Sequence, residues 1–137
     1  MSTDTLIADR IEIADLFSRF ARLLDEKNWE HAATVFAADI AVTSPRAGEL
    51  RGIDQVVEYI RQAEVEGEHT QHITTDLLVT VDGDLAEAQA NSLVYFYRDG
   101  EAPHQSSGIR LGATVIRTQA GWRLRETRTV LRWIRKD

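Results

Sequence analysis

The sequence predicts one α+β domain, with helices in its first half and long antiparallel strands in its second. Apolar residues recur at three- and four-residue steps up to about residue 60 and alternate with polar residues from His72 onward. The turn signals Asp82-Gly83 and Ala120-Gly121 divide the second half into hairpin-connected strands. Helices packed on one face of such a sheet predict a curved sheet around an apolar cavity. No repeat or linker divides residues 1–137, which are expected to form a single domain.

Three helices are expected ahead of the long strands. The first spans about Leu6–Leu24 and takes its N-terminal cap from Thr3 or Asp4. The second is expected over Trp29–Ala37, and the third over Ile53–Ile60. Each of these segments shows one apolar stripe at helical spacing, and that stripe is the face expected to pack on the sheet.

The strands are expected at five places along the chain. A short strand is expected at Ile40–Ser44, before the third helix. Four long strands are expected after that helix, at His72–Val81, Leu85–Tyr97, Ile109–Thr118 and Trp122–Ile134. The long strands should form a meander in which short turns join neighbours.

Composition excludes several classes of protein. The chain has 137 residues, no cysteine and a net charge of −6 at pH 7. Without cysteine there can be no disulfide, thiol nucleophile or cysteine-ligated zinc site. The negative charge disfavours a nucleic-acid partner, and no apolar run approaches the ~20 residues of a membrane span. The start of the chain does not resemble a signal peptide, so we expect a cytoplasmic protein with neither a nucleic-acid nor a membrane partner.

Neither a cofactor nor a metal is expected. The sequence lacks a glycine-rich phosphate loop and a Gly-x-Ser-x-Gly nucleophile elbow. His69 and His72 are three residues apart on an expected strand, so their side chains should leave opposite faces and not share an ion. His31 and His104 have no obvious co-ligands in the sequence.

Two remaining residues could carry chemistry. Asp25 follows an apolar helical face, and His72 begins a long strand. A carboxylate beside an imidazole orients the ring, fixes its tautomer and stabilises the imidazolium, which is what a general base needs. The other interpretation is a histidine bonded to a backbone carbonyl and an aspartate capping the next helix. The spacing of the two residues does not decide between these interpretations.

Three groups of segments occur in an order that is typical of a known family. They are Leu16–Trp29 with Phe36–Asp39, His69–Asp76 with Asp82–Ala86, and Gly121–Leu124 with Arg128 and Trp133. Together they span nearly the whole chain, which resembles the SnoaL-like group of the nuclear-transport-factor-2-like (NTF2-like) superfamily.

The resemblance implies both a fold and a chemistry. The implied fold is a cone-shaped α+β domain in which three N-terminal helices pack on a strongly curved antiparallel sheet that encloses an apolar cavity. Asp25 and His72 match an Asp-His pair of the dehydratase-like and dehydrochlorinase-like members. The implied activity is that of a cofactor-free cyclase, dehydratase or isomerase. It would remove a proton from a small apolar metabolite, polyketide-like or steroid-like.

The chain departs from the pattern of this family at two positions. Phe20 stands where several members have a tyrosine, and Asn28 replaces a second acid. Negative charge on the substrate would then be stabilised by Arg128, the third candidate catalytic residue, or by a tyrosine such as Tyr95. Phe20, Tyr95 and Trp29 are the candidate substrate-binding residues, and Trp29 is also expected to anchor the core.

Two other functions stay open. The departures at Phe20 and Asn28 favour a non-catalytic small-molecule-binding or scaffold protein on the same fold. A limonene-epoxide-hydrolase-like site would need Asp25, Arg128 and a second acid, for which Asp76 is the nearest choice.

The final strand also suggests a partner. Trp122 and Trp133 have opposite parity on this strand, so one should face the helices and the other the far side of the sheet. A large apolar group on an outer face usually marks an interface. We therefore expect a homodimer through the open face of the sheet.

Overall fold

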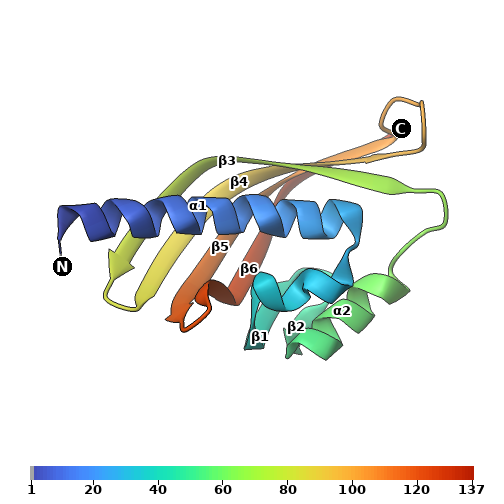
Figure 1. Cartoon of the computed structure of the whole chain (residues 1–137). Helices are drawn as coiled ribbons and strands as arrows, with labels where there is room; N and C mark the ends of the chain where they lie inside the picture. Colours follow the sequence, from blue (N-terminus) through green and yellow to red (C-terminus); the bar gives the residue numbers. More distant parts are fainter. Residues whose placement is uncertain (1) are drawn as a thin grey trace.

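The computed structural model describes residues 2–137 and confirms the α+β fold (Figure 1). Two α-helices, one short 3-10 helix and six strands make up this part of the chain. In order they are α1 (Thr3–Glu26), η1 (Trp29–Thr34), β1 (Phe36–Ser44), β2 (Gly48–Arg51), α2 (Ile53–Gln62), β3 (His69–Asp82), β4 (Leu85–Tyr97), β5 (Gln105–Thr118) and β6 (Gly121–Lys136).

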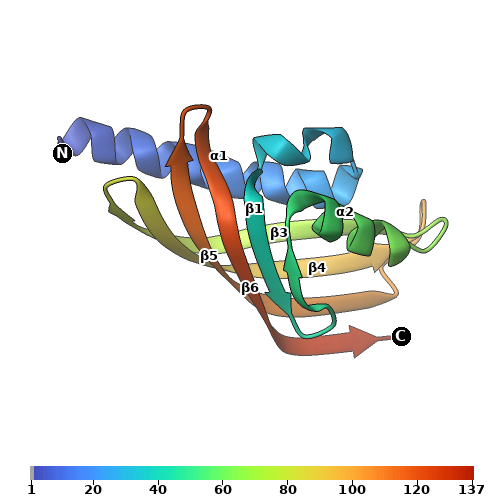
Figure 2. The same ribbon diagram turned by 90° about the horizontal axis from the view of Figure 1, so that it is seen from below.

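The strands form one curved, unclosed sheet in the order β2-β1-β6-β5-β4-β3. Strands β3 to β6 form the expected meander, and β1 joins it by pairing in parallel with β6. Helix α1 crosses one face of the sheet, and α2 lies beside β1 and β2 (Figures 1 and 2). The face under α1 is called the inner face below.

Irregular pairing accompanies the curvature of the sheet. The register between β3 and β4 shifts between Thr75 and Leu78, where Asp76 has a φ of 56°. Strands β5 and β6 shift register twice, beside Ile109 and beside Val115. A bulge of this kind bends a strand and changes which residues face inward, so it decides which side chains reach a site under the helix.

The prediction of a second α-helix over Trp29–Ala37 was wrong. The chain makes only the short η1 helix, and Phe36 begins β1 opposite Leu124 of β6. The Leu124 N–H donates to the Val35 carbonyl at 2.9 Å. Pairing with a strand 88 positions later in the chain cannot be seen in local periodicity, and here it overrides the helical spacing. As expected, the strand that contains Ile40–Ser44 precedes the helix at Ile53: both β1 and β2 come before α2.

The core lies between α1 and the inner face of the sheet. Ile13, Leu16 and Phe17 are the most deeply buried side chains of α1. They belong to one apolar cluster that also contains Phe36, Ile40, Ala113, Val115, Trp122 and Leu124 from the sheet. At ~25 cal/mol per Å² of buried apolar surface, this cluster is the main force that holds the helix on the sheet.

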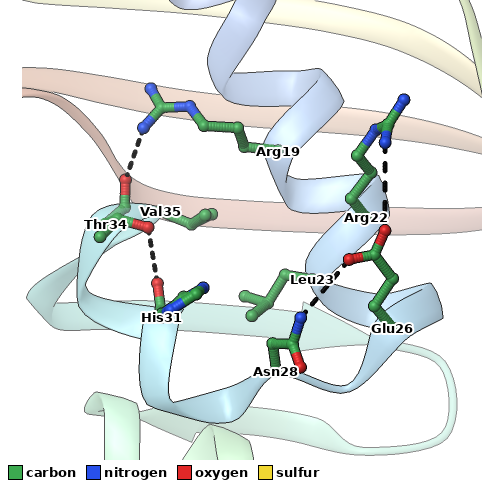
Figure 3. Close-up of a pocket in the computed structure, with 8 residues that line it drawn as sticks. All are labelled: Arg19, Arg22, Leu23, Glu26, Asn28, His31, Thr34 and Val35. Carbon is green, nitrogen blue, oxygen red and sulfur yellow. Dashed lines mark hydrogen bonds and ion pairs between the residues drawn. The ribbon is translucent and has the colours of Figure 1, made fainter.

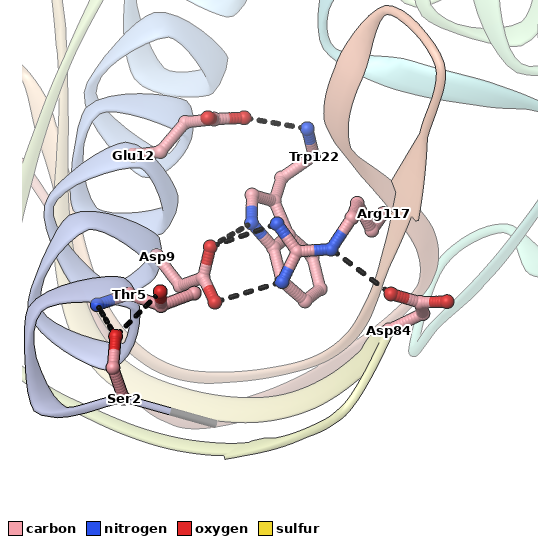
Figure 4. A network of polar contacts seen from close by, with 7 residues as sticks. All are labelled: Ser2, Thr5, Asp9, Glu12, Asp84, Arg117 and Trp122. Atoms are coloured by element: carbon pink, nitrogen blue, oxygen red, sulfur yellow. Dashed lines mark hydrogen bonds and ion pairs between the residues drawn. The ribbon is translucent and has the colours of Figure 1, made fainter.

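A partly buried ion pair fixes the N-terminal half of α1 (Figure 4). The guanidinium of Arg117 donates to both carboxylate oxygens of Asp9, at 2.9 and 2.8 Å, and the Trp122 indole N–H donates to the same carboxylate at 3.2 Å. The Arg117 bonds lower the pKa of Asp9; burial opposes that effect, and the Trp122 bond adds to the lowering. The Asp9 carboxylate is therefore charged in the folded protein at neutral pH.

Trp122 and Trp133 differ in exposure. Trp122 is completely buried, and Trp133 is 46% exposed. Pairing between β1 and β6 ends at Arg128, so the strand beyond it pairs only with β5. The homodimer through this part of the sheet stays a prediction. Within residues 2–137, neither helix combines the length and the apolar character that a bilayer crossing requires.

Replacing Asp9 with asparagine should destabilise the fold strongly. The change leaves Arg117 without its buried partner, and removing one member of such a pair costs about 2–4 kcal/mol. Urea unfolding of the two proteins measures the difference. Asp39→Asn is the matched control, because Asp39 pairs with Arg125 at 3.6 Å on the surface and should change stability by less than about 1 kcal/mol. Equal effects of the two substitutions would contradict the role given to Asp9.

The Asp9 pair should also make stability depend on pH. The folded-state pKa of Asp9 lies below its ordinary value of 3.8. Its contribution is therefore present above about pH 4 and lost as the pH falls through the folded-state pKa. We expect the free energy of unfolding to fall more steeply with acidification in the wild type than in Asp9→Asn. Urea titrations at a series of pH values measure both slopes, and parallel slopes would contradict the prediction.

Candidate active site

The structure brings Asp25 and His72 into direct contact. Asp25 lies in the last turn of α1, which ends at Lys27 in the left-handed conformation with a φ of 60°. Its Oδ1 is 2.6 Å from His72 Nδ1, and its Oδ2 accepts the His72 backbone N–H at 2.9 Å. The Thr70 hydroxyl donates to Oδ1 at 3.0 Å. Three bonds from one strand therefore hold this carboxylate, and its role in catalysis remains a prediction.

The hydrogen bonds decide the state of the pair. Burial raises the pKa of Asp25. The side-chain and backbone hydrogen bonds from His72, the positive charge of a protonated His72 and the bond from the Thr70 hydroxyl lower it, and together they bring the pKa of Asp25 below its ordinary value. A carboxylate only accepts hydrogen bonds, so His72 Nδ1 must carry the proton in this contact. In the neutral ring that leaves a lone pair on Nε2. Among residues 2–137, no group hydrogen-bonds Nε2. In the same residues no side-chain nitrogen or oxygen is both fully buried and unpaired, so Nε2 is accessible to solvent.

His72 lines a small cavity under α1, called the inner cavity. Its volume is about 160 Å³. Its walls are formed by Phe20, Ala21, Leu24, His72, Thr74, Ser92, Ile109, Leu111 and Thr129. These side chains are apolar or carry neutral hydroxyls, apart from the imidazole. An apolar hollow with a few polar groups is the usual form of a small-molecule site.

His72 also borders an open depression on the surface between α1 and β3, called the outer depression. Asp25, Arg22 and Gln71 lie around it, and its volume is about 390 Å³. Ala21, His72 and Thr74 line both spaces. The imidazole and carboxylate side chains are 17% and 21% exposed. The pair thus stands at the boundary between the buried hollow and solvent, where a substrate can reach it.

Arg128 does not join the site. It bonds Glu126 at 2.9 Å, Glu87 at 3.1 Å and Thr114 at 3.3 Å, all on the outer face of the sheet. The reason is the register shift beside Val115, which inserts one extra residue into β6. Without that bulge Arg128 would share the face of Trp122 and Leu124; with it, the neighbouring Thr129 faces the inner cavity instead. The expected role of Arg128 in charge stabilisation is therefore corrected.

Two of the three expected substrate-binding residues lie elsewhere. Tyr95 sits next to the buried Val94 on β4 and so faces the outer side. Trp29 is a core residue, 8% exposed, whose indole N–H donates to Glu64 at 3.4 Å. Neither lines the inner cavity, whereas Phe20 does. The Phe20 ring also meets Phe36 edge-on, with centroids 5.6 Å apart.

Nor does the structure assemble the set of residues needed for an epoxide-hydrolase-like site. Asp76 lies at the β3 bulge and accepts from the Asn91 side chain at 3.2 Å, on the outer face of the sheet. Asp76 and Arg128 are therefore both separated from Asp25 by the sheet itself.

The hydroxyl residues around the inner cavity were missed in the sequence. Thr70, His72 and Thr74 alternate along β3, and Ser92 and Thr129 come from β4 and β6. Period-two alternation from His72 was the available signal for Thr70 and Thr74. Regular alternation along β4 was the signal for Ser92, whereas no comparable signal marks Thr129, because a bulge decides the parity of β6.

Another surface hollow lies between α1 and η1 (Figure 3), and it shares Arg22 and Glu26 with the outer depression. Its charged groups bond within the hollow: Arg19 donates to the Thr34 carbonyl at 3.2 Å, and Arg22 lies 4.0 Å from Glu26. The bond from Arg19 to Thr34 joins α1 to η1 at this hollow.

The SnoaL-like domain family matches residues 5–128. The chain belongs to this family. The match covers most of the chain, including Asp25, His72 and every residue around the inner cavity except Thr129. The family resemblance expected from the sequence is thereby confirmed.

Solved structures from several bacteria share the fold. A Kribbella flavida protein is 20% identical over 95% of each chain, with a TM-score of 0.85. The hexachlorocyclohexane dehydrochlorinase LinA-type3 of Novosphingobium barchaimii is 16% identical, covering 99% of this chain and 94% of that one, with a TM-score of 0.85. A candidate scytalone dehydratase of Novosphingobium aromaticivorans is also 16% identical, covering 99% and 92%, with a TM-score of 0.85. No curated protein matches the sequence.

Proposed function

We propose that this SnoaL-like protein is a cofactor-free enzyme that removes a proton from carbon in a small, largely apolar metabolite. His72 acts as the base, and Asp25 positions and charge-stabilises it. The observation that carries the proposal is the 2.6 Å contact between Asp25 Oδ1 and His72 Nδ1 at the edge of the inner cavity. That contact directs the basic Nε2 away from the carboxylate and leaves it free for a substrate.

The step can be followed atom by atom. Nε2 of His72 takes a proton from a substrate carbon beside an electron-withdrawing group, and the ring becomes an imidazolium bonded to Asp25. The electron pair left on the substrate then expels a leaving group, forms a ring bond or shifts a double bond. The imidazolium returns its proton to the leaving group, to another substrate atom or to water. Elimination, cyclisation and isomerisation share this first step.

The structural neighbours support the elimination class. One is named for loss of hydrogen chloride and another for loss of water. Both names describe reactions that break a carbon–hydrogen bond beside a leaving group. The same class of reaction fits a site that offers one base inside an apolar hollow.

The volume of the inner cavity limits what it can enclose. An engineered cavity of ~150 Å³ in another protein binds benzene, so a hollow of about 160 Å³ holds roughly one six-membered ring. A larger polyketide-like or steroid-like molecule would place one ring beside His72 and extend into the outer depression.

A non-catalytic binding protein is the second candidate. It is favoured by one observation: among residues 2–137, His72 is the only titratable residue that lines the inner cavity, so none of its lining residues is an acid ready to protonate a leaving group. In that case the Asp25–His72 contact would only shape the binding site.

Exchange of carbon-bound hydrogen separates the two candidates. Wild-type protein should speed the uptake of deuterium from D2O at the carbons beside the carbonyl of monocyclic ketones such as cyclohexanone, cyclohexenone and cyclopentanone. His72→Ala should reduce the acceleration by about 10²–10⁴-fold, because the base is gone. Asp25→Asn should also reduce it, because the ring loses its orienting carboxylate. Proton NMR of the ketone measures the rate.

His69→Ala is the matched control for this experiment. His69 lies on the same strand but pairs with Asp99 at 3.0 Å, away from the inner cavity. Its loss should leave the exchange rate unchanged. Circular dichroism checks that each variant folds. A wild-type protein without acceleration, or a folded His72→Ala variant that keeps it, would contradict the proposed function.

A further inference from the structure

Ser92 is a buried serine whose hydroxyl has no hydrogen-bond partner among residues 2–137. The residue is 3% exposed and lines the inner cavity. Among residues 2–137, no group hydrogen-bonds its hydroxyl. In the same residues every side-chain nitrogen or oxygen without a partner is at least slightly accessible, so the Ser92 oxygen must be accessible too. The Ser92 oxygen therefore opens into the inner cavity. A buried hydroxyl usually finds a hydrogen-bond partner, so one left free at a cavity wall is poised to bond a ligand.

The position of Ser92 relates it directly to the base. On the inner face, Ser92 of β4 stands opposite Thr74 of β3, and Thr74 follows His72 by one inward-facing position. Directly opposed residues have Cβ atoms ~4.5–5.5 Å apart. The imidazole and the two hydroxyls therefore occupy one corner of the inner cavity. Phe20, Leu24 and other apolar side chains form the remaining wall.

The inner cavity offers no positive side chain to a developing negative charge. Its lining residues include no lysine or arginine, and Arg128 is held on the outer face by Glu87 and Glu126. Charge that appears on a substrate oxygen beside His72 must be met by neutral donors. Of these donors, Ser92 is the most buried residue.

We propose that Ser92 donates a hydrogen bond to a carbonyl oxygen of the substrate, so that the site takes a small carbonyl compound. This inference rests on the proposed function and names the substrate class for it. His72 Nε2 takes the proton from the carbon beside the carbonyl. The carbon–hydrogen electron pair becomes a carbon–carbon double bond, and the carbonyl π pair moves onto oxygen. The Ser92 bond strengthens as that oxygen becomes an enolate, which makes Ser92 a catalytic residue.

A pair of ligands of one shape tests the hydrogen bond. Cyclohexanone and methylenecyclohexane share a ring, and only the first has an oxygen that accepts a hydrogen bond. Ser92→Ala should weaken cyclohexanone binding by about 3- to 10-fold, as loss of one neutral hydrogen bond predicts, and should leave methylenecyclohexane binding unchanged. Ligand-detected NMR titration measures both affinities. Ser92→Cys, which keeps the side-chain size but donates weakly, should behave like Ser92→Ala.

Ser107→Ala is the matched control. Ser107 is 8% exposed on β5, opposite Val94, and does not line the inner cavity. Its loss should change neither affinity. Equal weakening of both ligands by Ser92→Ala, or no weakening of cyclohexanone by either Ser92 variant, would overturn the proposal.

Deuterium exchange into the same cyclohexanone separates this proposal from the function on which it rests. If His72→Ala abolishes exchange but the Ser92 variants bind cyclohexanone normally, Ser92 does not bind the carbonyl, so the proposal for Ser92 fails and the base stands. If the Ser92 variants lose the preference for cyclohexanone but His72→Ala keeps exchange, Ser92 binds the carbonyl and the base is wrong.

Discussion

One helix held against the sheet by a carboxylate near each end organises this molecule. Asp9 binds Arg117 and Trp122 beside the turn between β5 and β6, and Asp25 binds Thr70 and His72 at the β3 edge. At 1.5 Å per residue, the two anchors lie ~24 Å apart along α1. The apolar face between them is closed onto the sheet. The helix thus roofs the inner cavity, and the bond that fixes its second end is also the candidate active-site contact.

The bulges in the sheet decide the chemistry beneath that roof. They turn Arg128 and Asp76 outward, and in the part of the chain that the structure describes they leave the imidazole as the one titratable group that lines the inner cavity. Hydroxyls from three strands supply the remaining polarity. A cavity of this kind favours a neutral ligand, because a charged one would lose its hydration and gain no opposite charge. Base and neutral donors together suit a reaction that passes charge briefly onto a substrate oxygen.

The sequence predicts some of these features and not others, for physical reasons. The long strands and α1 follow from periodicity, and the Asp25–His72 contact was expected because both positions match a family pattern. A strand was expected over Ile40–Ser44, but the first part of β1, from Phe36, was missed because its partner lies near the other end of the chain. The Asp9–Arg117 pair joins residues 108 positions apart, which no local pattern marks. The outward turn of Arg128 depends on one extra residue in a strand, which is a property of pairing rather than of composition.

The tautomer of His72 tests the central contact most directly. Long-range proton–nitrogen NMR of the imidazole at neutral pH distinguishes a ring protonated on Nδ1 from one protonated on Nε2. The carboxylate at 2.6 Å predicts that Nδ1 carries the proton and that Nε2 shows the shift of an unprotonated nitrogen. A neutral ring protonated on Nε2 would contradict the account, because it would have no lone pair facing the substrate.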